Sequence, residues 1–363
     1  MKAFFNRVRW SAWLFALMVA ALGWYLLNFD FGSGLVNLSY DLLHILRPKI
    51  PAGEAVIVYL DEKSHIDLVQ PLNAPWDRAL HAQLIDGLTV AGARAIVMDI
   101  VFSDANPDKA EADQKLADAM KRSGRVIIGA DHVGLSDGIK QYVKPAELFE
   151  TNAVAYGSVE MWLSRDLIVR GQAPNEQLPS ISWEAAKFLA APVTGQMDAE
   201  KFEPSIDLKV PHSWVQYYGP PNWLKSMRYS DALQTAATNS FFSNKVVFIG
   251  AKVITKLQNE RNDAYRNPYS FWMTQKEDAP LIFGVEIQAT MFLNILRSDW
   301  LRRWPLATES WIMIVVGALS GYGLLRLRPI IAILVAVAAL GAVVFISREL
   351  FIRNLTWFPW LIL

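Results

Sequence analysis

The sequence has no cysteine among its 363 residues and only five histidines. Without cysteine the chain can form no disulfide, no thiolate metal site and no cysteine nucleophile. It also lacks a P-loop, a G-x-G-x-x-G motif and an H-E-x-x-H motif, so it carries no signature of nucleotide binding or zinc-dependent hydrolysis. We therefore expect no catalytic residues, no cofactor and a function other than catalysis.

Neither sign of charge is in excess, because 35 basic residues balance 35 acidic ones. A chain without a net positive field lacks the electrostatic footprint of nucleic-acid binding, so we expect no nucleic-acid partner. Hydrophobic residues make up 53% of the composition. This fraction is high for a purely soluble protein and indicates membrane segments.

Three apolar runs have the length of membrane-spanning helices, for which about 20 residues are needed. They occupy residues 10–28, 308–325 and 329–346. A cleaved signal peptide remains the alternative for the first run. Residues 355–363 are expected to start a further apolar or transmembrane segment that is cut short. The lipid bilayer is thus an expected partner.

Two clusters of positive charge beside these runs predict the same orientation. Basic residues occur in the N-terminal stretch 1–9 and in the turn 326–328, and such residues favour the cytoplasmic side. Residues 29–307 are then expected to form a domain in the periplasm or outside, anchored in a bacterial inner membrane by several spans.

Within 29–307 strand patterns alternate with helix patterns. Continuous apolar runs predict buried strands, and apolar residues at helical spacing predict helices. The predicted strands are Ala55–Leu60, Ala95–Ile100, Val126–Gly129, Ala153–Val159 and Val246–Ile249, and the predicted helices cover 31–47, 77–91, 109–122, 182–190 and 284–297. Residues 259–280 show no period and are expected to form a long loop. The pattern predicts an α/β fold, with a mostly parallel sheet and helices on both faces.

Acidic residues follow three of the predicted strands: Asp61, Asp99 and Asp131. Carboxyl ends of parallel strands share one edge of a sheet, so these side chains could converge on a cleft. Such a cluster could hold a hard cation, but the spacing matches no known metal loop, and we expect no metal. The alternative is that the carboxylates cap helices or pair with Arg78 and Lys63.

The stretch Pro75–Arg78 places Trp76 and Arg78 at the start of a predicted helix. The two side chains could cradle a ligand by stacking and bidentate bonding. Equally, Trp76 could cover the end of the core while Arg78 neutralises Asp61 or Asp99. The candidate cleft comprises Asp61, Ser64, Trp76, Arg78, Asp99, Phe102 and Asp131.

Several stretches together resemble the second type of CHASE domain, an extracellular sensory domain associated with bacterial cyclases and histidine kinases. They are DEKS at 61–64, PWDRALHAQLIDGL at 75–88, GARAIVMDIVF at 92–102, D-x-x-L-A at 113–117, YGP at 218–220, SNKVVFIGA at 243–251 and GVEIQATMFLNIL at 284–296. The chain departs from the family between Arg165 and Arg170, where an Asp-Gly pair often precedes an arginine, and again after Gly250.

The resemblance implies a sensor that binds a small-molecule or protein ligand and signals to a cytoplasmic output not present in this sequence. We expect the helix 284–297, with Gly284, Glu286 and Gln288, to transmit the signal within a homodimer. A competing hypothesis is a structural or assembly subunit that uses the domain to dock a protein. Hydrolysis at the acidic cleft is a third.

Overall fold

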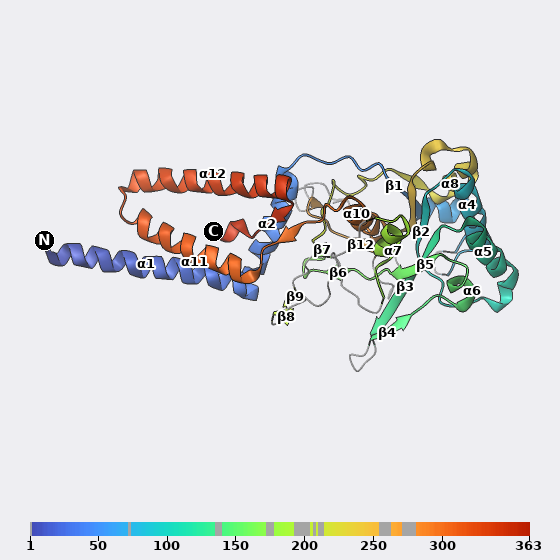
Figure 1. Ribbon diagram of the computed structural model, residues 1–363, viewed down its shortest axis with the longest axis horizontal. Helices are drawn as coiled ribbons and strands as arrows, with labels where there is room; N and C mark the ends of the chain where they lie inside the picture. Colours follow the sequence, from blue (N-terminus) through green and yellow to red (C-terminus); the bar gives the residue numbers. More distant parts are fainter. Residues whose placement is uncertain are drawn as a thin grey trace. The chain divides into compact units, whose positions relative to one another are not determined.

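The computed structural model describes residues 2–71, 74–134, 140–171, 178–191, 204–205, 208–209, 214–253, 263–270 and 281–363. The chain divides into two compact units. One comprises Met1–Pro48 together with Leu301–Leu363, and the other is Lys49–Trp300. Figure 1 shows that the first unit consists mainly of helices and that the second contains both helices and strands.

The second unit is built on a seven-stranded sheet with the order β10-β1-β11-β2-β3-β4, and β5 also pairs with β3. In chain order these strands are β1 (Ala55–Asp61), β2 (Ala95–Val101), β3 (Val126–Gly134), β4 (Lys140–Val143), β5 (Ala155–Ser158), β10 (Ser226–Arg228) and β11 (Val246–Lys252). All pairings are parallel except that of β3 with β4. The expected mostly parallel α/β fold is confirmed.

Helices cover both faces of this sheet because alternate strand residues are apolar on both sides. In β1, Val56 and Val58 face one apolar cluster, and Ala55 and Ile57 face another. The first cluster is closed by α4 (Arg78–Val90), α5 (Ala110–Ser123), α6 (Glu147–Glu150) and α8 (Tyr229–Thr235). The second is closed by α7 (Ile181–Phe188) and α10 (Gly284–Arg297). The strands are therefore apolar without alternation because both faces of the sheet are buried.

Shorter elements connect the main ones. They are α3 (Glu62–Asp67), β6 (Trp162–Leu163), β7 (Val169–Gly171), β8 (Pro204–Ser205), β9 (Leu208–Lys209), β12 (Ala264–Tyr265) and β13 (Ile282–Phe283). The expectation of a structureless loop over 259–280 is wrong in part, since β12 pairs antiparallel with β13. A two-residue strand is too short to show a period in the sequence. Residues 259–262 and 271–280 lie outside the described residues.

The first unit contains α1 (Lys2–Asn28), α2 (Ser33–Leu46), α11 (Leu306–Leu324) and α12 (Pro329–Asn354). Helices α1 and α11 pack through small residues. A Cβ atom on Gly321 would lie 2.8 Å from the Cα of Ala16, and one on Gly317 would lie 3.0 Å from the Cα of Ala20. Small residues at such an interface let two helix backbones approach closely, as is common between membrane helices.

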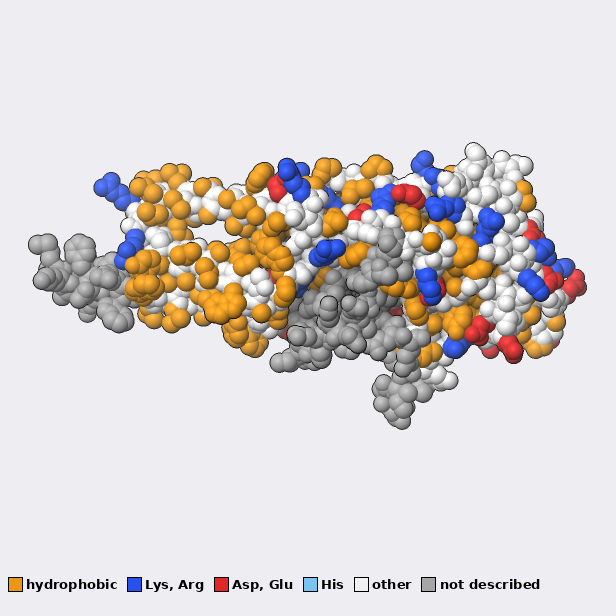
Figure 2. All heavy atoms as spheres, viewed as in Figure 1, with side chains coloured by type: hydrophobic (Ala, Val, Ile, Leu, Met, Phe, Trp, Pro, Cys, Tyr) orange, Lys and Arg blue, Asp and Glu red, His pale blue; other side chains and the backbone are white. Residues whose placement is uncertain are grey.

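One helix among the described residues, α12, is long and apolar enough to cross a membrane by itself. Only 6% of its most apolar window is buried, and Figure 2 shows hydrophobic side chains gathered along the helices of this unit. Residues Ala12–Asn28 and Asp30–Leu46 meet the same measure only as a pair, which is bent by 85°.

Where the first unit's helices end, two short strands pair in parallel: β14 (Arg302–Arg303) with β15 (Thr356–Trp357). Arg303 forms an ion pair of 2.8 Å with Glu309, whose side chain is 1% exposed. The guanidinium of Arg303 also lies 4.9 Å from the ring of Trp357. The expected apolar segment 355–363 thus forms β15 and a short 3-10 helix, Trp360–Ile362.

Candidate functional site

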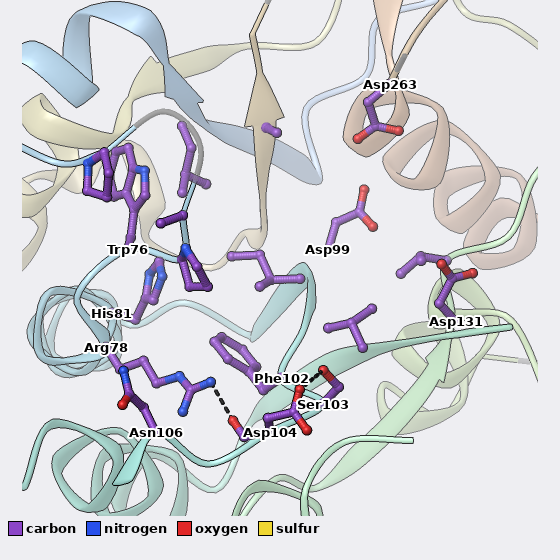
Figure 3. Close-up of a pocket in the computed structure, with 18 of the residues that line it drawn as sticks. Trp76, Arg78, His81, Asp99, Phe102, Ser103, Asp104, Asn106, Asp131 and Asp263 are labelled. Carbon is purple, nitrogen blue, oxygen red and sulfur yellow. Dashed lines mark hydrogen bonds between the residues drawn. The ribbon is translucent and has the colours of Figure 1, made fainter. Parts of the chain in front are cut away.

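A cavity of about 1360 Å³ lies beyond the carboxyl ends of β1, β2, β3 and β11. This is the edge of an open parallel sheet at which ligands commonly bind. Five of the predicted cleft residues line it: Trp76, Arg78, Asp99, Phe102 and Asp131. Figure 3 shows Trp76, Arg78 and Phe102 on one side and Asp99 and Asp131 on the other.

Asp61 and Ser64 are not among the residues that line this cavity. Asp61 is the N-cap of α3, where its Oδ1 accepts hydrogen bonds from the backbone N–H (2.9 Å) and the hydroxyl (2.6 Å) of Ser64. Its Oδ2 lies 3.3 Å from Nε of Arg228. Asp61 therefore satisfies the start of a helix, which is the alternative that its sequence position left open.

Arg78 is bound to the loop that follows β2. Its Nη1 donates to Asp113 Oδ1 (2.7 Å) and its Nη2 to the carbonyl of Asp104 (2.5 Å). Asp113 also accepts the N–H of Asn106 (2.6 Å). The expectation that Arg78 neutralises Asp61 or Asp99 is wrong, because α5 presents Asp113 to it instead. The guanidinium thus holds one rim of the cavity in place.

Arg78→Ala is expected to destabilise the folded chain by about 3 kcal/mol, since it leaves the buried carboxylate of Asp113 without its cation. The side chains of Arg78 and Asp113 are 13% and 2% exposed. The measurement is thermal unfolding of the full chain in detergent. The matched control is Arg122→Ala, which breaks the exposed pair with Asp86 and should cost at most about 1 kcal/mol. Equal losses in both variants contradict the assignment.

Trp76 covers the end of the core. It is 7% exposed, its indole N–H donates to Nδ1 of His65 (3.1 Å), and its ring meets that of Tyr229 edge-on at 5.0 Å. His81 lies beside it, with Nδ1 2.7 Å from the Tyr229 hydroxyl. Burial, and then the charge of Arg78, lower the pKa of His81 to about 4. This wall is therefore aromatic, and the imidazole of His81 is neutral at pH 7.

The opposite wall carries three carboxylates, of Asp99, Asp131 and Asp263 (Figure 3). Burial raises the pKa of Asp99 well above its ordinary value, and the charges of Asp263 and then Asp131 raise it further. Within the part of the chain that the structure describes, no three histidine or acidic side chains are arranged to hold a metal ion. The sequence did not single out Asp263, because it lies within the stretch 259–280, which shows no periodicity.

Asp99→Asn is expected to stabilise the chain at pH 7. The pKa of Asp99 is higher in the folded state than in the unfolded state, so the folded state binds more protons between these two values and stability falls as the pH rises through that window. The amide removes this penalty, and each 1 kcal/mol gained raises the unfolding midpoint by about 2–4 °C. Thermal unfolding measured across pH tests it, with the exposed Asp118→Asn as control. A lower midpoint for Asp99→Asn at pH 7 contradicts the prediction.

Helix α10 reaches the acidic wall with its first turn. A Cβ atom on Gly284 would lie 2.9 Å from Oδ1 of Asp263 and 2.9 Å from Cε of Met161, so the start of the helix lies close to both side chains. The next residue, Val285, packs against Gly250 of β11. A Cβ atom on Gly250 would lie 2.6 Å from the Cβ of Val285 and 3.2 Å from the Cβ of Asp99. The first turn of α10 therefore lies against Asp263 and against the part of β11 that is next to Asp99.

Glu286 and Gln288 bind α10 to two other segments. Glu286, 2% exposed, accepts the N–H groups of Asn222 (3.1 Å) and Trp223 (3.0 Å). Gln288 accepts the hydroxyl of Ser182 (2.5 Å) and donates to the carbonyl of Val159 (3.2 Å), which lines the cavity. The three residues expected to transmit a signal are thus all packed, and two of them contact residues of the cavity wall.

Residues 134–138 read GLSDG, which has the spacing of a G-x-S-x-G motif. In hydrolases this motif joins a strand to a helix. Here it falls between β3 and β4, which pair antiparallel with Gly134 opposite Lys140. The surrounding secondary structure is therefore not that of a nucleophile elbow.

Comparison with protein families supplies the remaining observation, since the family model described as CHASE2 domain matches residues 14–323. The chain belongs to the CHASE2 domain family. CHASE2 domains are extracellular sensory domains. Comparison with curated proteins and with solved structures found no significant match.

Proposed function

We propose that this chain is the sensory module of a membrane-anchored receptor. A ligand or partner binds in the cavity outside the cytoplasm, and α10 passes the change on toward the membrane helices. The observation that carries the proposal is the contact of α10 with the cavity wall: the N–H of Gly284 donates to the carbonyl of Asp263 (3.0 Å), and Val285 packs against Gly250, which lies beside Asp99. A ligand that favours one position of these carboxylates acts on the helix directly.

The burial of α10 supports its role as the moving element. Every residue from Gly284 to Ile295 is buried. Near its far end Asn294 accepts the N–H of Gln216 (2.8 Å) and donates to the hydroxyl of Tyr218 (2.9 Å). A buried helix with satisfied polar groups shifts between discrete packings rather than deforming locally. Helix α10 ends at Arg297, and α11 begins at Leu306.

The membrane arrangement that fits this role has several spans. The basic stretch 1–9 and the turn 326–328 then lie in the cytoplasm, and the sensor lies in the periplasm of a bacterial cell. The close packing of α1 and α11 at Gly317 and Gly321 suits two helices that cross together. A homodimer gives such a receptor a way to turn a small helix shift into a signal.

A ligand screen on a filled-cavity variant tests the proposal. Thermal unfolding of the full chain in detergent is measured with a library of ions and small metabolites, for wild type and for Ala251→Phe, whose side chain enters the cavity. Ala110→Phe, at an exposed position on α5, is the control. Compounds that stabilise wild type and Ala110→Phe but not Ala251→Phe support the cavity as the ligand site. Equal responses in all three proteins contradict it.

A further inference from the structure

Helix α2 carries an apolar stripe that its own unit does not bury. The stripe consists of side chains that are exposed or half-buried: Leu35, Leu38, Leu42, Ile45 and Leu46. Residues three and four positions apart lie on the same side of a helix, so these five form one face. Leu35 and Leu46 are 39% and 40% exposed, and Phe31, just before the helix, is 82% exposed.

A helix of this chain that faces water has a different pattern. In α5 the exposed positions after Ala110 are Glu111, Gln114, Lys115, Asp118, Lys121 and Arg122. Such polar side chains opposite a buried apolar face are typical of a surface helix. The α2 stripe has leucine and isoleucine where α5 has charge. A continuous exposed apolar face of this kind marks a surface that contacts a protein or a membrane.

The opposite face of α2 is held by aromatic residues of the same unit. The carbonyl of Ser39 accepts the indole N–H of Trp360 (3.0 Å). The ring of Tyr40 lies 5.4 Å from that of Trp357, and the ring of His44 lies 5.0 Å from that of Phe351 in α12. These contacts fix the rotation of α2 about its own axis. The stripe therefore points away from the helices that α2 packs against.

Both ends of α2 lie where apolar helices end. At its start the chain bends by 85° after α1, and the last residue of α1, Asn28, donates to Oγ of Ser310 in α11 (3.2 Å). At its end the carbonyl of Leu46 accepts Nε of Arg348 (2.9 Å), which follows the apolar run 329–346 of α12. Helix α2 thus crosses the ends of α1 and α12 over about 21 Å, as Figure 1 shows.

Exposed aromatic rings mark the same level of the unit. Trp24, Tyr25 and Phe29 at the end of α1 are 41%, 45% and 46% exposed. Trp311, 66% exposed, follows the serine of α11 that binds Asn28. Aromatic side chains gather at the two interfaces between a bilayer and water. The start of α2 therefore lies at the level expected for such an interface.

We propose that α2 is an interfacial helix that lies in the outer leaflet of the bilayer. The stripe and Phe31 contact acyl chains, so the partner of this surface is lipid. The inference goes beyond ligand sensing and rests on the membrane anchoring within the proposed function. Because α2 ends at Leu46 and β1 begins at Ala55, the bilayer then holds the chain close to the point where it enters the sheet.

Single spin labels on the full chain in nanodiscs of phosphatidylethanolamine and phosphatidylglycerol test the proposal. Collisions with oxygen report contact with lipid, and collisions with a water-soluble nickel chelate report contact with water. The test positions are Leu35→Cys and Leu46→Cys. Asp118→Cys on α5 is the reference for water, and Leu340→Cys, 59% exposed on α12, is the reference for the hydrocarbon core.

We expect both test labels to favour oxygen over nickel and to lie about 5–10 Å below the boundary between headgroups and acyl chains, shallower than the label at position 340. Asn37→Cys, half-buried on another side of α2, is the matched control on the same helix. Its ratio of oxygen to nickel collisions should be lower than the ratio at either test position. An equal ratio at all three positions overturns the assigned face.

The other outcomes separate the alternatives. Nickel collisions at both test positions as frequent as at position 118 overturn the proposal, because the stripe then faces water. Protection from both reagents overturns it in favour of a covering protein surface, such as a second copy of the chain. A depth equal to that at position 340 overturns it in favour of a membrane-spanning or re-entrant α2. Frequent nickel collisions at position 340 contradict the membrane anchoring itself, whereas a failure confined to α2 leaves the anchoring intact.

Discussion

Gly250→Val is expected to unseat α10 from the sheet and to destabilise the chain by about 3 kcal/mol. A Cβ atom at this position would lie 2.6 Å from the Cβ of Val285 and 3.2 Å from the Cβ of Asp99. Both neighbours belong to regular elements with little freedom to retreat, one on α10 and the other on β2. The added branch therefore separates the helix from the cavity wall.

Thermal unfolding of the full chain measures this effect. Gly53→Val is the matched control, because nothing lies within 4 Å of the position that its Cβ would take. A second variant, Gly250→Ala, adds the Cβ without the branch and should lose less stability than Gly250→Val. A Gly250→Val chain as stable as Gly53→Val contradicts the tight contact of α10 with this strand.

Glu286→Ala is expected to cost about 3–5 kcal/mol, because it leaves buried donors without an acceptor. The carboxylate accepts the N–H groups of Asn222 and Trp223 and the Tyr59 hydroxyl (3.3 Å). Burial raises the pKa of Glu286, although these hydrogen bonds oppose the rise. The residue thus ties α10 to the segment before β10.

Hydrogen exchange gives this prediction a local readout. The amides of Asn222 and Trp223 should lose protection in Glu286→Ala and keep part of it in Glu286→Gln, which retains one acceptor oxygen. Glu111→Ala is the control for losing a carboxylate, since the Glu111 side chain is 85% exposed. Full protection of both amides in Glu286→Ala contradicts the role assigned to this side chain.

The sequence was most informative where burial is uniform. β1, β2 and β11 are apolar on both faces, so their runs could be located without a structure, and α10 was predicted with its observed bounds because its apolar spacing is regular. The convergence of Asp99 and Asp131 followed from parallel strand order alone. These predictions depend on neighbours that are close in the chain or on a general property of sheets.

The partners of charged side chains could not be predicted in this way. Arg78 pairs with Asp113, 35 residues further on, and Asp61 caps its own helix instead of joining the cavity. Asp263 enters the site through the short pairing of β12 with β13, which leaves no periodic signal. Such contacts depend on the tertiary arrangement. The sequence offers several carboxylates as partners for each basic side chain and does not show which one lies next to it.

Occupancy of the cavity is proposed to move α10 and, with it, the membrane helices. The chain has no cysteine, so two cysteines can be introduced and spin-labelled without labelling of any native residue. One pair joins exposed positions Gln83 and Ser298, and another joins Leu319 on α11 and Leu340 on α12, which are 67% and 59% exposed. Distances are measured in nanodiscs with and without the compound that stabilises wild type most.

We expect the compound to shift both distance distributions in wild type and neither of them in Ala251→Phe. Distributions that stay the same in wild type while the compound is bound contradict it.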